Sequence, residues 1–222
     1  MPSVASLYFN AVMEHLHPDA DLQLNPIVIG FSETHIFKND EDKEGTTVVS
    51  KHAQGSMILS KSYDEMQRQL VLVHIQKTST EQVGNKQSSE QTQHFNLVVL
   101  EDDNAYLFEP DARPDVYKQQ IVGMVAAQFP LHKLTVLNCH PQVELGDPLC
   151  MAYVCQFADA VLRYLKTSVA VVCAKCFPKG GVDNSIAAYQ FAYKMQQEIP
   201  GLGPMPAGEH EETWLDKHKG LR

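Results

Sequence analysis

The stretch HFNLVVLEDDNAYLFEPD, from His94 to Asp111, constrains the fold of this 222-residue chain more than any other. Its two apolar runs are separated by the polar turn EDDN, a pattern that predicts two antiparallel strands joined by a short turn. In such a hairpin the start of the first strand lies beside the end of the second. We therefore expect His94 to lie next to Glu109 and Asp111, where either carboxylate could orient the imidazole.

The segment GDPLCMAYVCQFADAVLRYLK is the most strongly specified helix in the sequence. Asp147 suits the N-cap and Pro148 the first helical position, whereas Arg163 and Lys166 suit the end. Cys150 would then be the third helical residue, in the turn whose unpaired amides and dipole favour an anion. This position favours the nucleophilic thiolate. The alternative is an ordinary core cysteine, since free cysteines are among the most often buried residues.

The remaining pattern predicts a mixture of helices and strands. Helices are expected at about 5–17, 113–129 and 184–198, and strands within 25–31, 46–51, 55–61, 68–77 and 133–139. The polar segments 38–47 and 78–93 are predicted to be loops, the second of them mobile or partly disordered. On this interpretation His94 begins the strand that follows.

Composition and charge exclude several classes of protein. The 18 basic and 27 acidic residues give a formal charge of −9, which repels nucleic acid unless the basic residues cluster. The sequence has no run of 18 apolar residues, and its start lacks the pattern of a signal peptide, so we expect neither a membrane protein nor a secreted one. Five cysteines, an odd number, indicate reduced thiols.

Cys173 and Cys176 form a CxxC pair, which is half of a zinc site or a redox pair. The sequence shows no second pair of ligands at suitable spacing nearby. We therefore interpret CAKC as the end of a buried segment, with metal or redox chemistry as the alternative, and we expect neither a metal nor a cofactor.

The order of these features resembles the adenovirus endopeptidase, adenain, and its relatives. That group includes the ubiquitin-like-protein-specific proteases and the capsid-maturation proteases of large DNA viruses. The resemblance is carried by a histidine followed by an aromatic residue (His94, Phe95), by YLFEP at 106–110, and by a glutamine followed by a cysteine that opens a helix. It covers roughly 94–165, about a third of the chain.

The resemblance implies a role for each matching residue. Cys150 would be the nucleophile and His94 the general base of a thiol protease. Glu109 would be the triad acid, with Asp111 as the alternative acid. Gln142 would donate a hydrogen bond in the oxyanion hole.

The resemblance also implies an α+β fold of the papain-like, adenain type, in which a mixed or antiparallel sheet packs against the nucleophile helix. One protease domain would span 1–222, because a chain of this length can fill one substantial core. It would comprise a divergent N-terminal part at 1–90, a catalytic core at 94–200 and a tail at 201–222.

The function implied is a cysteine endopeptidase that cleaves after small residues, of the Gly-Gly-X or Gly-X type. Its partners would be polypeptides, namely viral capsid or core precursors, together with an activating peptide in some relatives. It would act in the virion and in the host cytoplasm or virus factory. Two alternatives stay open: an isopeptidase acting on ubiquitin or a similar modifier, and an inactive capsid or scaffold protein, because Met151 stands where glycine commonly follows the nucleophile.

Overall fold

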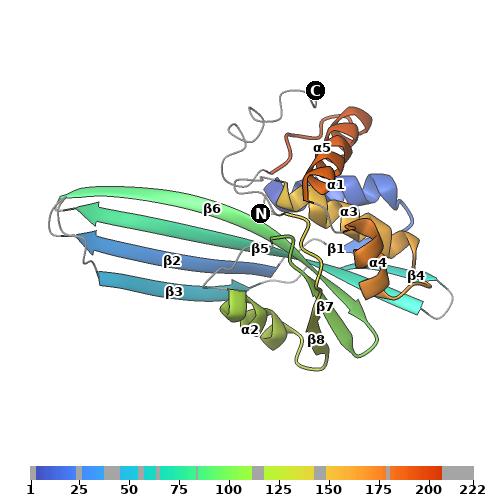
Figure 1. Ribbon diagram of the computed structural model, residues 1–222, viewed down its shortest axis with the longest axis horizontal. Coiled ribbons are helices and arrows are strands. Elements are labelled where there is room, and N and C mark those ends of the chain that lie inside the picture. The colour runs from blue at the N-terminus through green and yellow to red at the C-terminus, as the bar shows by residue number, and fades with distance from the viewer. Residues whose placement is uncertain are drawn as a thin grey trace.

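The computed structural model describes residues 4–23, 27–37, 46–54, 58–63, 66–83, 85–111, 118–142, 149–178 and 181–206 (Figure 1). Within these ranges a single mixed sheet carries helices on both of its faces. The chain therefore has the mixed helix and strand content of the predicted α+β class. The papain-like arrangement of the adenain type stays a prediction.

The described helices are α1 (Val4–Leu16), α2 (Lys118–Gln128), α3 (Cys150–Arg163), α4 (Val169–Cys176) and α5 (Gly181–Glu198). The described strands are β1 (Asp21–Gln23), β2 (Ile27–Phe37), β3 (Thr46–Gln54), β4 (Ile58–Tyr63), β5 (Met66–Val83), β6 (Lys86–Glu101), β7 (Asn104–Phe108) and β8 (Lys133–Val136).

The long antiparallel pair of β5 and β6 forms the centre of the sheet. β7 and then β8 continue the sheet beyond β6. The other edge of β5 is shared, because β4 pairs with its first part and β2 with its second part. β1 lies outside β4, and β3 lies outside β2. Only the β2–β5 and β7–β8 pairs are parallel among the described strands, so the sheet is mixed.

Apolar residues on both faces of β6 divide the core into two clusters. Phe95, Leu97 and Val99 belong to the larger cluster, which is covered by α1, α3, α4 and α5. Val98 and Leu100 point to the opposite face and belong to a second cluster with buried residues of α2. A strand buried on both faces must be apolar at successive positions, which explains the continuous run in the sequence.

Helix α3 lies at the centre of the larger cluster, with ten of its 14 residues buried. The ring of Phe157 on α3 packs 4.5 Å from Phe108 at the end of β7, and Phe177 stacks on Phe108 at 5.3 Å. A buried hydrogen bond of 2.8 Å joins the hydroxyls of Tyr153 on α3 and Ser185 on α5. These contacts fix the position of α3 over β6 and β7.

A buried arginine joins the sheet to the C-terminal end of α3. The Arg68 residue on β5 is 1% exposed, and its Nε donates to Glu101 Oε1, on its cross-strand neighbour, at 2.7 Å. The same guanidinium donates to the carbonyl oxygens of Val161 at 2.8 Å, Tyr164 at 3.1 Å and Thr167 at 2.6 Å. The carbonyl of Val161 belongs to the last turn of α3, where the helix itself supplies no donor and the dipole favours a cation.

The prediction of a mobile loop at 78–93 was wrong. These residues extend β5 and begin β6, so that His94 lies well inside a strand and not at its start. Residues 78–83 pair with 86–91, from Thr78↔Gln91 to Val83↔Lys86, and Thr80 and Ser89 share a hydroxyl hydrogen bond of 2.8 Å. Strand pairing satisfies the hydrogen bonds of the backbone and does not require apolar side chains. The polar composition of this segment therefore did not indicate that it forms strands.

The other predicted elements are partly confirmed. The predicted helix at 5–17 and the strands near 27, 46, 58 and 133 are confirmed by α1, β2, β3, β4 and β8. CAKC belongs to α4, a helix that was not predicted. The last two residues of the predicted loop at 38–47 belong to β3, whereas residues 38–45 of that loop and residues 113–117 of the predicted helix lie outside the described residues.

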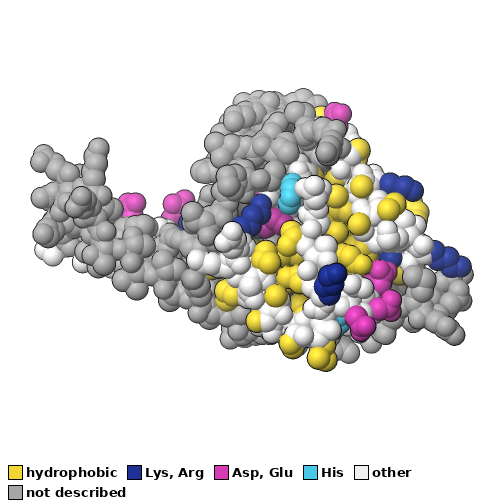
Figure 2. Space-filling view, turned by 60° about the horizontal axis from the view of Figure 1, so that its bottom comes forward, with side chains coloured by type: hydrophobic (Ala, Val, Ile, Leu, Met, Phe, Trp, Pro, Cys, Tyr) yellow, Lys and Arg dark blue, Asp and Glu magenta, His cyan; other side chains and the backbone are white. Residues whose placement is uncertain are grey.

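The described part of the face shown in Figure 2 carries no concentrated positive charge. Lys and Arg side chains are scattered singly over its described part, and hydrophobic side chains gather between them. No helix within the described ranges is long and apolar enough to cross a membrane.

Replacing Arg68 should destabilise the fold strongly. Arg68→Met leaves Glu101 and three carbonyl oxygens without their donor, so we expect the free energy of unfolding in urea to fall by about 3–5 kcal/mol. The matched control is Lys194→Met on α5, since Lys194 is 64% exposed and its pair with Glu198 is 3.7 Å long. That exposed pair should contribute less than about 0.5 kcal/mol. Equal losses in both variants would contradict the anchoring role of Arg68.

Candidate functional site

The candidate site lies where β7 stops covering β6. β7 pairs with β6 only from Leu97 onward, and Leu97 is opposite Phe108, the last residue of β7. The chain after β7 therefore runs beside the part of β6 that contains His94 and Asn96. Continuing the register places Glu109 opposite Asn96, on the same face as His94 two residues away.

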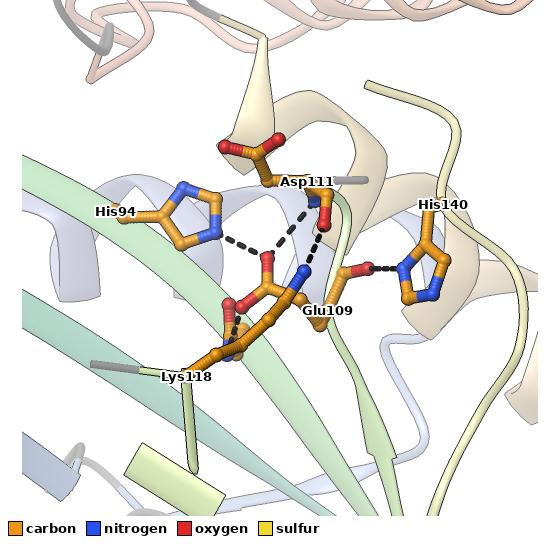
Figure 3. A network of polar contacts seen from close by, with 6 residues as sticks. His94, Glu109, Asp111, Lys118 and His140 are labelled. Atoms are coloured by element: carbon orange, nitrogen blue, oxygen red, sulfur yellow. Dashed lines mark hydrogen bonds and ion pairs between the residues drawn. The ribbon is translucent and has the colours of Figure 1, made fainter. Parts of the chain in front are cut away.

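The carboxylate of Glu109 receives three hydrogen bonds (Figure 3). Its Oε1 accepts from His94 Nε2 at 2.5 Å and from the backbone N–H of Asp111 at 2.9 Å. Its Oε2 accepts from Asn96 Nδ2 at 2.8 Å. The Glu109 side chain is 6% exposed and the His94 side chain 25% exposed, so the pair is screened from solvent mainly on the acid's side.

Burial and charge act in opposite directions on the pKa of Glu109. Burial raises this pKa, but the charge of His94 and the hydrogen bonds from His94, Asp111 and Asn96 lower it, and the net result lies below the ordinary 4.5. The acid is therefore an ionised carboxylate at neutral pH.

His94 contacts both the acid and the thiol. Burial alone would lower the pKa of His94, but the negative charge of Glu109 and hydrogen bonds to the side chains of Cys150 and Glu109 raise it well above the ordinary 6.5. Because Nε2 is bound to Glu109, Nδ1 is the ring nitrogen left for a second partner. The imidazole thus interacts with both a carboxylate and a thiol.

Cys150 is placed by the start of α3. The helix begins at Cys150, with Leu149 as its N-cap, and the first backbone donor within the helix is Tyr153, which binds the Leu149 carbonyl at 3.0 Å. Cys150 is thus the first helical residue, and not the third as predicted. Asp147 and Pro148, the predicted cap and first residue, lie outside the described residues. The backbone N–H of Cys150 still belongs to the first turn, which offers donors to an anion.

The loop after β7 is held by two further contacts. His140 Nδ1 donates to the carbonyl oxygen of Glu109 at 2.8 Å, and Lys118 Nζ donates to the carbonyl oxygen of Asp111 at 2.7 Å (Figure 3). Both contacts fix the backbone that carries the acid and leave its carboxylate for His94 and Asn96.

Asn96, His140 and Lys118 were not predicted from the sequence. The sequence does contain an indication for Asn96, because this residue lies two positions after His94 and therefore on the same face of a strand. The sequence contains no indication for His140 or Lys118, since their contacts depend on how distant segments approach one another.

The two remaining predicted site residues lie beside Glu109. Asp111 contributes its backbone amide to the Glu109 carboxylate, which in turn accepts a hydrogen bond from His94. Gln142 forms a parallel bridge with Asp111, and its N–H donates to the carbonyl oxygen of Pro110 at 2.9 Å. The Gln142 side chain is buried. The segment 143–148, which leads from Gln142 to α3, lies outside the described residues.

Cys150 alone among the five cysteines acts on the pKa of His94. Burial raises the pKa of the Cys155 and Cys173 thiols, and it raises that of Cys176 to about 12. Cys139 shares a side-chain hydrogen bond with Cys173, and all five cysteines are free thiols. Over the described ranges, no group of three or more His, Cys, Asp or Glu side chains is placed to hold a metal ion.

A small cavity of about 70 Å³ lies beside His94 on the face covered by α2. Its apolar walls are Phe31, Ile75 and Ile121, and its polar rim is formed by residues of β5 and β6 that lead away from His94. The cavity offers room for a small side chain next to the imidazole.

Comparisons with protein-family models, with curated proteins and with solved structures found no match for this chain.

The ion pair between His94 and Glu109 should make stability depend on pH. The raised pKa of His94 contributes stability that is complete below 6.5 and is lost as the pH rises through the folded-state pKa. The lowered pKa of Glu109 contributes stability that is complete above 4.5 and is lost as the pH falls through its folded-state pKa. The free energy of unfolding lost in Glu109→Gln should therefore be largest between these two values.

Urea denaturation of both proteins at a series of pH values measures this difference. Asp111→Asn is the control, because it removes a neighbouring carboxylate and keeps the backbone amide that binds Glu109. If Glu109→Gln loses the same free energy of unfolding at pH 4, 6 and 9, the ion pair contributes no stability beyond that of the packing of Glu109.

Proposed function

We propose that the chain is a cysteine endopeptidase in which Cys150 is the nucleophile, His94 the general acid and base, and Glu109 the orienting acid. The observation that carries this proposal is one imidazole that lies 2.5 Å from a buried carboxylate and interacts with the thiol that opens a helix. In acyl transfer by a thiol protease, the carboxylate orients the imidazole and the imidazole activates the thiol.

The charges of the site favour an activated thiol. The raised pKa of His94 keeps the imidazole protonated at neutral pH, and an adjacent imidazolium stabilises a thiolate. The first turn of α3 adds its dipole and unpaired amides at the same sulfur. Glu109 holds the imidazole through Nε2 and leaves Nδ1 for Cys150.

In the proposed reaction, the Cys150 thiolate attacks the carbonyl carbon of the scissile peptide. His94 passes its proton to the leaving amine as the C–N bond breaks, which leaves a thioester on Cys150. His94 then takes a proton from water, whose oxygen attacks the thioester and releases the acid and the thiolate. The backbone N–H of Cys150 would donate to the oxyanion, and the resemblance to adenain assigns the second donor to Gln142. Each such donor contributes roughly 3 kcal/mol in comparable sites.

The size of the cavity beside His94 supports a peptide substrate with a small residue near the scissile bond. A cavity of about 70 Å³ with apolar walls suits such a residue better than a bulky one. It favours an endopeptidase over an isopeptidase, which needs an extended groove for a folded modifier. Viral capsid or core precursors are the substrate class that the sequence resemblance supports.

Thiol labelling separates an active enzyme from an inactive scaffold. Cys150 is 1% exposed, whereas Cys139 and Cys176 are half-buried, so exposure alone predicts that iodoacetamide reacts first at Cys139 and Cys176. Activation by His94 predicts that Cys150 reacts first at pH 6–7, because the thiolate is the reacting species. Peptide mass mapping after partial labelling identifies the modified cysteine.

His94→Ala should slow the labelling of Cys150 and abolish peptide cleavage, whereas Cys150→Ser should abolish cleavage with little change in stability. The labelling of Cys139 in His94→Ala is the internal control for altered exposure. If His94→Ala changes neither labelling nor cleavage, the hairpin has no catalytic role.

Glu109 should control the pH profile of cleavage. Removing its charge in Glu109→Gln lowers the pKa of His94, so the alkaline limb of kcat/KM should move to lower pH. The maximal rate should also fall by roughly 10²-fold, because the imidazole loses its orienting acceptor. The matched variant Asp111→Asn should move the limb far less, since Asp111 acts on Glu109 through its backbone. A larger shift in Asp111→Asn than in Glu109→Gln would make Asp111 the acid.

A further inference from the structure

The strand that carries His94 continues far beyond the helices. Figure 1 shows β2, β3, β5 and β6 extending from the helical part as a long arm, with β6 along its outer edge. In the arm, β6 runs from Lys86 to Gln93, and its side chains there are exposed or half-buried. The side chains of β6 in the arm are neutral and polar except at Lys86 and Glu90.

Among the described strands, one edge of β6 has no partner along the arm. β5 pairs with β6 over its full length on one side, whereas β7 pairs with β6 on the other side only from Leu97 to Glu101. No other strand in the described part of the chain pairs with β6. The segment Lys86–Gln93 therefore has a strand neighbour on one side only.

The register shows which backbone groups point to this open edge. Glu101 and Asn104 flank a two-residue turn and are partners in the β6–β7 pair, so the N–H and C=O of Glu101 point towards β7. Backbone direction alternates along a strand, and the β5–β6 register is continuous. The odd-numbered positions 87, 89, 91 and 93 consequently point their N–H and C=O groups away from β5, on the side that β7 covers further along.

This edge lacks the features that normally protect a free edge. Soluble proteins block exposed edges with proline, bulges, short strands or several charges. From Lys86 to Gln93 the sequence has no proline and only two charged residues, and the β5 register has no bulge. An edge with these properties is suited to accept another extended strand.

We propose that the open edge of β6 binds the polypeptide substrate as an added β-strand and so leads it to His94. This inference rests on the proposed function, because the substrate is the occupant that the continuity of β6 favours. A strand paired with positions 87–91 runs towards His94, which lies three residues further along β6. A second hollow, of about 240 Å³, lies on the β5–β6 pair at the level of positions 91–93 and is lined by polar residues: Gln76, Lys77, Thr78, Gln91, Thr92 and Gln93.

The chemistry of the edge defines the class of substrate. Backbone hydrogen bonds recognise any extended segment, and the Gln, Ser and Thr side chains of β6 accept neutral polar neighbours. Sequence preference is then concentrated at the small cavity beside His94. The enzyme would therefore cleave small residues flanked by extended, β-prone segments, and short peptides that end at the scissile bond would bind weakly.

The test measures peptide binding separately from cleavage. The probe is the fluorescein-labelled peptide Thr-Val-Thr-Val-Gly-Gly-Ala-Thr-Val-Thr, bound to full-length Cys150→Ala protein and followed by fluorescence anisotropy. Adding Gln91→Pro removes one outward N–H without removing a bond to β5 and should weaken binding by about tenfold or more. Gln91→Val, which keeps the N–H, should retain the affinity, and circular dichroism checks that both variants fold.

A peptide N-methylated at alternate valines tests the same bonds from the ligand's side and needs no variant of the arm. It should bind at least about tenfold more weakly than the parent peptide if backbone pairing holds it. Peptides extended only before or only after Gly-Gly show which side of the scissile bond lies on the arm.

Each other outcome overturns the proposal. Absent binding, or binding that Gln91→Pro and N-methylation leave unchanged, excludes strand addition at this edge. A dimer in light scattering that Gln91→Pro converts to monomer, without peptide binding, assigns the edge to a second copy of the chain. Cleavage of the probe by the unmutated protein is measured separately. Cleavage without binding at the edge would support the proposed protease activity and contradict the proposed binding edge. Binding at the edge without cleavage would support the binding edge and contradict the protease activity.

Discussion

The buried guanidinium of Arg68 fixes the relation between the sheet and α3. It joins Glu101 on β6 to three carbonyl oxygens at and beyond the end of that helix. A guanidinium that is 1% exposed is stable only while these acceptors stay in place, because burying an unpaired charge is costly. Since a helix is a rigid rod, fixing its C-terminal end also restricts Cys150 at its N-terminal end.

The Glu109 carboxylate fixes the position of His94, as Arg68 fixes that of α3. Its two oxygens collect donors from β6 and from the loop that follows β7, while its carbonyl is held by His140. Removing any one of these donors leaves a buried oxygen less satisfied, so the three segments stabilise one another. The His94 imidazole inherits its orientation from this network, and its raised pKa follows from the same charge.

The sequence could predict the parts of the site that depend on local pattern. The apolar runs around His94 and Glu109 predict a hairpin, and a hairpin brings the two side chains together. The strand character of 78–83 and 86–93 depends instead on pairing between β5 and β6, on the pairing of 78–83 with β2 and on a cross-strand hydroxyl contact, which a polar composition does not reveal. The contact of His140 with Glu109 and the start of α3 at Cys150 likewise depend on distant segments.

The chain order of the site affects how it is made. The hairpin that unites His94 with Glu109 is closed by a two-residue turn, and such local contacts form early in folding and during synthesis. The nucleophile follows later in the chain, and its helix is anchored only after Val161 and Thr167 can reach Arg68. A nascent chain therefore carries the acid and base before it holds a nucleophile, and under the proposed function it cannot digest itself or its neighbours until the fold is complete.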